Sequence, residues 1–308
     1  MRKRRKFHSG VVNHVYQRTV DGVQLFYCLE DYLVFYTIFS VCARSSNVQI
    51  LELCLMHNHI HSLIKTETAK ELADFADHFS AWFVYEYNSF AGRSGRLLKK
   101  NFGSAPKWDE KRLRSAIIYI GNNPVEKHFC KRAVEYRWNF LAYINSKHPF
   151  SEKLILRNSS SKMLKAVKEI NNMVHLNRPL KYAQLIRLTK DLSDKELQQL
   201  IDYIICSYSP FDYDSLISHF SSYESMLMAM DSTTGDDFDI KESRDGFSLK
   251  IFDEIMRHLG KSMSYNQVRK LTSLPIDERI TIGKELQKHT SATNSQICNF
   301  LHIRNQNK

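Results

Sequence analysis

Residues 55–64 read LMHNHIHSLI, a segment with three histidines in five positions followed by an apolar run. Side chains two positions apart on an extended strand point to the same face of a sheet. We therefore expect His59 and His61 to project together, while Ile60 points into a core on the opposite face. Two imidazoles on one rigid strand are two-thirds of a divalent-metal site, and a chance cluster of histidines on a surface strand is the alternative interpretation.

Length and composition indicate a soluble globular protein of one to three domains. The chain has 308 residues, 43% of them hydrophobic and 25% charged. No run of about 18 apolar residues occurs, so neither a transmembrane helix nor a membrane partner is expected. The basic N-terminus is not followed by the apolar segment of a secretory signal. The six cysteines are scattered without a Cys-x-x-Cys pair, which is typical of reduced thiols in a cytoplasmic protein.

Positive charge is concentrated in the first half of the chain. Residues 1–150 hold 22 Lys and Arg against 13 Asp and Glu, whereas residues 151–308 hold 22 against 20. A basic field of this kind favours a polyanion, and nucleic acid is the usual one. The glycine-containing loop at residues 90–107 suits a phosphate backbone, with an ordinary solvated loop as the alternative. The candidate DNA-binding residues are Arg2, Lys3, Arg4, Arg5, Arg93, Arg96, Lys99, Lys100, Arg112 and Arg114.

Strand and helix signals alternate over the first 150 residues. The patterns predict strands at residues 11–18, 48–55 and 59–64, and helices at residues 30–43, 68–87 and 109–123. Thr68 and Glu71 form a capping box that opens the second helix. Pro124 is expected to end the third helix, because helical geometry is disfavoured for the residue before a proline.

The second half of the chain is predicted to be helical throughout. The segment from Asp231 to Gly246 is acidic and short of large apolar residues, so it is the linker candidate. We therefore divide the chain into a first domain at residues 1–150 and helical regions at residues 151–235 and 246–308. The last predicted helix, Thr293 to Ile303, follows a short polar turn. It resembles the recognition half of a helix-turn-helix DNA-binding domain, with a generic helical bundle as the alternative.

A tyrosine and an amide supply the rest of the candidate chemistry. Tyr119 and Asn123 are four positions apart on a predicted helix, so they share a face one turn from each other. A divalent metal held by His59, His61 and Asn123 is able to polarise a scissile phosphate as a Lewis acid. Mixed nitrogen and oxygen ligation leaves open positions for phosphate oxygens on Mg²⁺ or Mn²⁺. Tyr119 is the candidate nucleophile, and the phosphotyrosine it forms stores the bond energy for rejoining.

In these motifs the sequence resembles the HUH (His-hydrophobic-His) single-tyrosine transposases, in particular the REP-associated tyrosine transposases. Asn58-His59-Ile60-His61 matches the Asn-His-x-His segment of the family. Residues 119–125, YIGNNPV, match its Tyr-Ile-x-x-Asn-Pro-Val segment. The histidine pair precedes the tyrosine, as in transposases and replication initiators. The resemblance covers about residues 1–145 and extends poorly to the C-terminal region.

The resemblance implies an α+β fold, a ferredoxin-like antiparallel sheet with flanking helices, followed here by an all-helical C-terminal region. It also implies cutting and rejoining of single-stranded DNA near hairpins, through a 5′-phosphotyrosine bond to Tyr119. In that reading His59, His61 and Asn123 are the ligands of Mg²⁺ or Mn²⁺. The function expected is that of a transposase or recombinase.

The sequence departs from the family at two positions. His57 stands where the family usually has proline, and Gly121 stands where many relatives carry histidine. We expect Asn58 to lie in a turn, which leaves His57 on the surface. If the strand begins earlier, His57, His59 and His61 share a face and form a three-histidine site suited to zinc and water activation.

Two other functions stay open at this point. One is a hairpin-DNA-binding protein that has lost catalysis, and the other is a metallohydrolase built on the three histidines. The sequence also leaves open whether the active site is completed within one chain or across a homodimer.

Overall fold

The sheet at the centre of the first domain has four antiparallel strands. The computed structural model describes residues 7–233 and 248–303. The strands lie in the order β2-β3-β1-β4, with the bounds β1 Val12–Arg18, β2 Gln49–Met56, β3 His59–Lys65 and β4 Gly103–Pro106. One helix connects β1 to β2 and another connects β3 to β4, which is the ferredoxin-like arrangement. The predicted α+β fold with an antiparallel sheet is confirmed.

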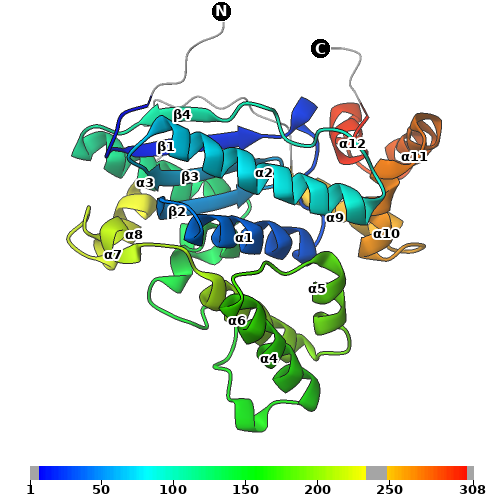
Figure 1. The fold of residues 1–308 in the computed structure, drawn as a ribbon. Helices are drawn as coiled ribbons and strands as arrows, with labels where there is room; N and C mark the ends of the chain where they lie inside the picture. Colours follow the sequence, from blue (N-terminus) through cyan, green and yellow to red (C-terminus); the bar gives the residue numbers. More distant parts are fainter. Residues whose placement is uncertain (1–6, 234–247, 304–308) are drawn as a thin grey trace, which may run out of the picture.

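Two helices cover one face of the sheet and a third covers the other (Figure 1). Their bounds are α1 Leu29–Arg44 and α2 Ala69–Ala91 for the first face, and α3 Glu110–Glu126 for the second. The alternation of side chains along the strands divides the apolar residues between two cores. Leu53, Leu55 and Ile60 face the phenylalanine-rich core under α1 and α2, whereas Cys54 and Leu63 face α3. The histidines of β3 belong to the second face.

Local signals placed several element ends correctly. The chain turns at residues 57–58 between β2 and β3, as the Asn58 signal predicts. The capping box is present, with the Glu71 amide donating to Thr68 Oγ1 at 3.1 Å and the Thr68 amide donating to Glu71 Oε2 at 2.9 Å. Helix α2 runs one turn beyond the predicted end, to the left-handed Gly92 at φ 68°.

Helix α3 continues past Pro124, so the expectation that this proline ends the helix is wrong. A proline within a helix removes a single backbone donor, so one intrahelical hydrogen bond is lost. Neighbouring contacts hold this turn. The Lys127 amide donates to Asn123 O at 3.1 Å, and the Asn122 side chain donates to Met230 O at 2.7 Å. These contacts outweigh the local preference of the residue before proline.

Helices dominate the second half of the chain, as predicted. Their bounds are α4 Ser161–His175, α5 Tyr182–Thr189, α6 Asp194–Tyr208, α7 Tyr213–Ile217, α8 Tyr223–Ser232, α9 Leu249–Leu259, α10 Tyr265–Lys270, α11 Ile276–His289 and α12 Asn294–Phe300. Helices α5 and α6 pack against α1, and α8 packs against α3 (Figure 1). The linker predicted at residues 231–246 lies largely outside the described residues. Within the described ranges, no helix is long and apolar enough to cross a membrane.

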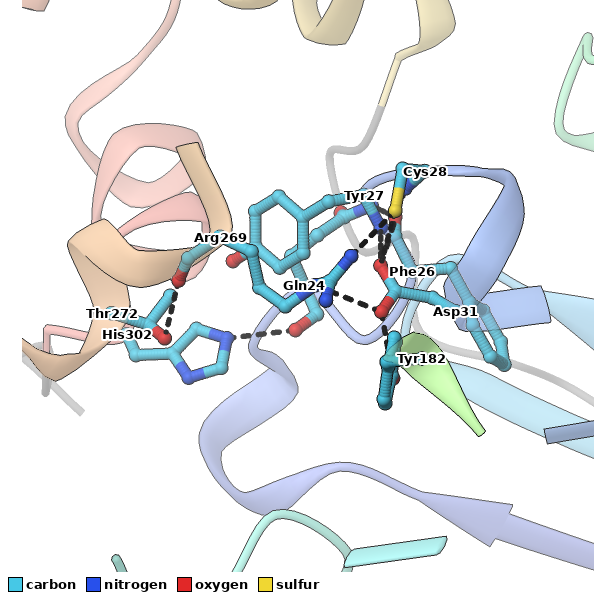
Figure 2. Close-up of polar contacts among 9 residues, drawn as sticks. All are labelled: Gln24, Phe26, Tyr27, Cys28, Asp31, Tyr182, Arg269, Thr272 and His302. Atoms are coloured by element: carbon cyan, nitrogen blue, oxygen red, sulfur yellow. Dashed lines mark hydrogen bonds and ion pairs between the residues drawn. The ribbon is translucent and has the colours of Figure 1, made fainter. Parts of the chain in front are cut away.

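The C-terminal helices attach to the first turn of α1 through a buried ion pair (Figure 2). Arg269 Nε lies 3.0 Å from Asp31 Oδ1, and both side chains are 0% exposed. The Tyr182 hydroxyl donates to the same oxygen at 2.8 Å, while the Tyr27 and Cys28 amides donate to Oδ2 at 2.8 and 3.2 Å. The ring of Tyr182 also lies 4.5 Å from the guanidinium of Arg269. We call these five residues the Asp31 junction, which joins three distant parts of the chain.

Candidate active site

The histidines of β3 meet the tyrosine of α3 on the second face of the sheet. The ring centroids of His59 and His61 are 4.9 Å apart, with the ring planes at 85°. The Tyr119 ring centroid lies 5.7 Å from that of His61. All three side chains are buried, and none is more than 2% exposed. The predicted pairing of the two motifs in space is therefore present in the structure.

Asn123 follows Tyr119 by one turn on the buried face of α3. Its amide oxygen Oδ1 is buried and accepts no hydrogen bond from the part of the chain that the structure describes. The neighbouring Asn122 differs, because its amide nitrogen donates to the Met230 carbonyl of α8 at 2.7 Å. A buried carbonyl oxygen without a donor is costly. Asn123 Oδ1 is thus an acceptor in place for a ligand.

A further histidine, His14 of β1, joins the site, and sequence reasoning missed it. Its Nε2 lies 2.9 Å from His61 Nδ1, and its ring centroid is 5.9 Å from that of Tyr119. Tyr16 is directly opposite His61 in the antiparallel pair of β1 and β3, so His14 is a diagonal neighbour of His61 on the same face. The alternation of side chains along residues 11–18 predicts which face of the strand carries His14. It does not predict the register of β1 against β3. We call the following residues the histidine cluster: His14, His59, His61, Tyr119 and Asn123.

Contacts at Nδ1 orient both histidines of β3. His59 Nδ1 lies 2.6 Å from Asn58 Oδ1, and the Asn58 amide nitrogen donates to Gly22 O at 3.3 Å, which identifies Oδ1 as the acceptor. His59 therefore carries a hydrogen on Nδ1 and presents its Nε2 lone pair. His61 Nδ1 also has a hydrogen-bond partner, His14 Nε2, and the tautomers of the two rings decide which nitrogen donates. Imidazoles that bind metals in proteins are usually held like this, by a hydrogen bond from the second ring nitrogen.

The histidine cluster has the donor atoms for a divalent cation. Two imidazoles and one amide oxygen form a mixed set that suits metals such as Mn²⁺ and leaves positions for phosphate oxygens. The buried Asn123 Oδ1, which receives no donor from residues 7–233 or 248–303, supports this fit. Over the same ranges, no three His, Cys, Asp or Glu side chains are grouped to hold a metal. The geometry therefore gives no support to the three-histidine alternative.

His57 lies in the turn with Asn58, but it is not on the surface. Its side chain is 4% exposed, and its ring centroid is 5.9 Å from that of Phe129. The expectation of a surface position is wrong because the segment after α3 covers the turn. A long-range contact of this kind has no signature in the residues around His57.

Gly121 of α3 packs closely against the Met230 side chain of α8. A Cβ atom added to Gly121 would lie 2.6 Å from Met230 Cε and 3.1 Å from Leu141 Cδ1. Met230 and Leu141 therefore occupy the space in which a side chain at position 121 would begin. The histidine that many members of the resembled family carry here has no counterpart in this chain.

The basic residues predicted to contact DNA are placed on separate surfaces. Arg96, Lys99 and Lys100 line an open groove beside α2, together with Gln17 and Ser80. Other members of the set have partners within the chain: Arg93 donates to Asn88 Oδ1, Arg112 pairs with Asp109, and Arg114 lies over the Phe220 ring. The remaining members, Arg2, Lys3, Arg4 and Arg5, lie outside the described residues.

The histidine cluster is closed to solvent in this structure, since none of its side chains is more than 2% exposed. Any ligand would therefore reach Tyr119 only after the segments around the cluster move. A small pocket lies between the loop at Gly22 and helices α9 and α12, and no residue of the histidine cluster lines it. His57 and Gln296 are among the residues that line it.

Comparisons with known proteins give a distant structural likeness. No protein-family model matches the chain, and no curated protein matches it. Among solved structures, it is similar to the structure of a REP-associated tyrosine transposase bound to a REP hairpin. The two chains are 14% identical with a TM-score of 0.37, over 45% of this chain and 81% of the other. A likeness at this level assigns neither family nor activity, so the function has to be argued from the site.

Proposed function

We propose that this protein is a metal-dependent transesterase of single-stranded DNA, a transposase or recombinase that nicks and rejoins DNA near hairpins. The observation that carries the proposal is the meeting of His59 and His61 with Tyr119 in one buried cluster. A tyrosine nucleophile beside two imidazoles oriented through Nδ1 suits phosphoryl transfer with a bound cation. All three residues come from one chain, so a second copy is not needed to bring them together.

The reaction assigned to Tyr119 is attack of its phenolic oxygen on the scissile phosphorus. The bond from phosphorus to the 3′ oxygen of the preceding nucleotide breaks, and the tyrosine proton ends on that oxygen. The 5′ phosphate remains on Tyr119, and attack by a 3′ hydroxyl reverses the step and rejoins the strand. His59, His61 and Asn123 would hold Mg²⁺ or Mn²⁺, which when bound polarises a phosphate oxygen as a Lewis acid.

The proposal also assigns the approach of the DNA. Arg96, Lys99 and Lys100 in the groove beside α2 would contact the phosphate backbone, as would the exposed Arg112 and Arg114. Helices α11 and α12 would act as a helix-turn-helix, because a four-residue polar turn joins them. Both assignments predict binding that weakens as salt concentration rises.

A covalent-adduct assay tests the proposed function. The full chain is incubated with hairpin oligonucleotides carrying single-stranded flanks and Mg²⁺ or Mn²⁺, and the products are separated on a denaturing gel. We expect a protein–DNA adduct that Tyr119→Phe lowers by at least about 10³-fold, since the nucleophile is removed. Tyr85→Phe, at a tyrosine 68% exposed on α2, is the matched control and should leave the adduct unchanged. An adduct that survives Tyr119→Phe contradicts the assignment of the nucleophile.

A hairpin-binding protein without catalysis is the second candidate, and the closure of the histidine cluster favours it. In that case the full chain binds the hairpin oligonucleotide in a salt-dependent way. It forms no adduct with either metal, although the hairpin is bound. The same gel therefore separates the two candidates.

A further inference from the structure

His14 is buried against the candidate metal ligands without being one of the predicted ligands itself. Its side chain is 1% exposed, and its Nε2 lies 2.9 Å from His61 Nδ1. The two ring centroids are 5.1 Å apart, with the ring planes at 34°. The register of β1 on β3 produces this contact, because Tyr16 is opposite His61 and His14 follows diagonally. A 2.9 Å contact between ring nitrogens is a hydrogen bond in which one nitrogen donates and the other accepts.

The neighbouring ligand shows which direction this hydrogen bond needs. His59 donates from Nδ1 to Asn58 Oδ1 at 2.6 Å, which leaves its Nε2 lone pair for a cation. For His61 to present Nε2 in the same way, its Nδ1 must carry the hydrogen. His14 Nε2 must then be the acceptor. Asn58 and His14 would thus play equivalent parts for the two histidines of β3.

We propose that His14 is a positioning residue for the metal site: it accepts the Nδ1 hydrogen of His61 and so fixes the tautomer that presents His61 Nε2 to a divalent cation. The proposal rests on the proposed function, because it assigns a task within the same site. His14 supplies no metal bond and takes no part in the attack on phosphorus. It fixes the direction of one lone pair and the orientation of one ring.

Metal binding by histidine variants tests this role. Mn²⁺ binding to the full chain is measured from the electron paramagnetic resonance signal of free Mn²⁺, without DNA. His14→Leu removes the acceptor and should weaken Mn²⁺ binding by about 10- to 100-fold, the usual loss when the hydrogen-bond partner of a metal ligand is removed. His14→Gln keeps a side-chain oxygen that is able to accept from His61 Nδ1, so its affinity should stay within a few-fold of the parent chain. His302→Gln, at a histidine bonded to the Gln24 carbonyl away from the cluster, is the control and should leave binding unchanged.

The tautomer of His61 is also directly observable in the parent chain. Long-range proton–nitrogen correlation spectra of the chain labelled with ¹⁵N-histidine, assigned with His61→Gln, should show His61 with its hydrogen on Nδ1. A hydrogen on Nε2 instead would overturn the proposal, even if His14→Leu failed to fold. Equal losses in His14→Leu and His14→Gln, or no loss in either, would also overturn it.

Failure of the proposed function has a different signature. If the parent chain binds no Mn²⁺, the metal site and the role of His14 fall together. If the parent chain and His14→Leu bind Mn²⁺ equally, only the role of His14 falls. A chain that binds Mn²⁺ with the expected pattern but forms no DNA adduct keeps the role of His14 and contradicts catalysis.

Discussion

The Asp31 junction and the histidine cluster are both buried and polar, but they differ in the hydrogen bonds that their buried oxygens accept. In the junction, Asp31 Oδ1 receives the Tyr182 hydroxyl and faces Arg269, while Oδ2 receives two backbone amides. In the histidine cluster, Asn123 Oδ1 receives no hydrogen bond from any residue in the described ranges. In the junction the chain supplies donors to both oxygens of Asp31, although Arg269 Nη1 has no hydrogen-bond partner in the described ranges. In the histidine cluster a buried acceptor is left unused, which gives that cluster the capacity for a ligand. The comparison separates a structural role from a functional one.

The largest effect that would test this comparison is expected at Arg269. Arg269→Met leaves the buried Asp31 carboxylate without its charge partner, which should lower the free energy of unfolding by about 3–5 kcal/mol in urea denaturation. Asp31→Asn in the same background removes the stranded charge and should recover part of this loss. Arg187→Met is the control, because Arg187 is 62% exposed in its pair with Glu169 and such pairs contribute about 0–1 kcal/mol. Similar losses at both arginines would show that the junction is not the structural element described here.

A ligand should stabilise the histidine cluster but leave the junction unaffected. At a free Mn²⁺ concentration of about 100 times the dissociation constant, the chain should gain about 2.7 kcal/mol of unfolding free energy. Asn123→Ala removes the acceptor and should abolish most of the gain. Asn122→Ala is a matched control, since its amide is already used by Met230 O. It should weaken the metal-free chain and keep the gain from Mn²⁺. Thermal denaturation of the parent chain and the two variants, each with and without Mn²⁺, measures these differences, and a gain retained by Asn123→Ala counts against the site.

The two regions also differ in how far the sequence predicts them. The common face of His59 and His61 follows from strand periodicity, and the spacing of Tyr119 and Asn123 follows from the helical turn. Both relations are local, and the structure has both. Only the resemblance to a family predicts that the histidine pair lies next to the pair of Tyr119 and Asn123. Periodicity does not show which helix covers which strands.

Contacts that depend on strand register or on packing between distant segments could not be predicted from the sequence. His14 meets His61 only because β1 and β3 pair with Tyr16 opposite His61. The sequence places Asp31 near the start of a predicted helix, but no residue near it indicates that Arg269 is its partner. The buried position of His57 likewise depends on Phe129, a residue from another segment. Sequence reasoning therefore proposed the candidate ligands and the candidate nucleophile, and it missed the residues that contact them.

Glu52 is a buried polar residue that belongs neither to the Asp31 junction nor to the histidine cluster. Its substitution is expected to have the smallest effect on the free energy of unfolding among these predictions. It lies on β2, is 2% exposed, and neither carboxyl oxygen accepts a hydrogen bond within the described ranges. Burial raises the pKa of Glu52 well above its ordinary value of 4.5. Between these two pKa values the folded chain holds a proton that the unfolded chain has released, so the free energy of unfolding falls as pH rises above 4.5.

Glu52→Met keeps the approximate volume of the side chain. It removes the buried carboxyl oxygens that lack hydrogen bonds, and with them the pH dependence that the raised pKa causes. We expect it to raise the free energy of unfolding by about 1–3 kcal/mol, with a larger gain at pH 8 than at pH 5. Urea denaturation at the two pH values measures the difference, and Glu278→Met, at an exposed position of α11, should show no gain that depends on pH. An equal gain at both pH values would mean that Glu52 finds a partner for its charged form. Glu52 would then resemble Asp31, and an unsatisfied buried oxygen would no longer be enough to distinguish Asn123 from the structural residues around it.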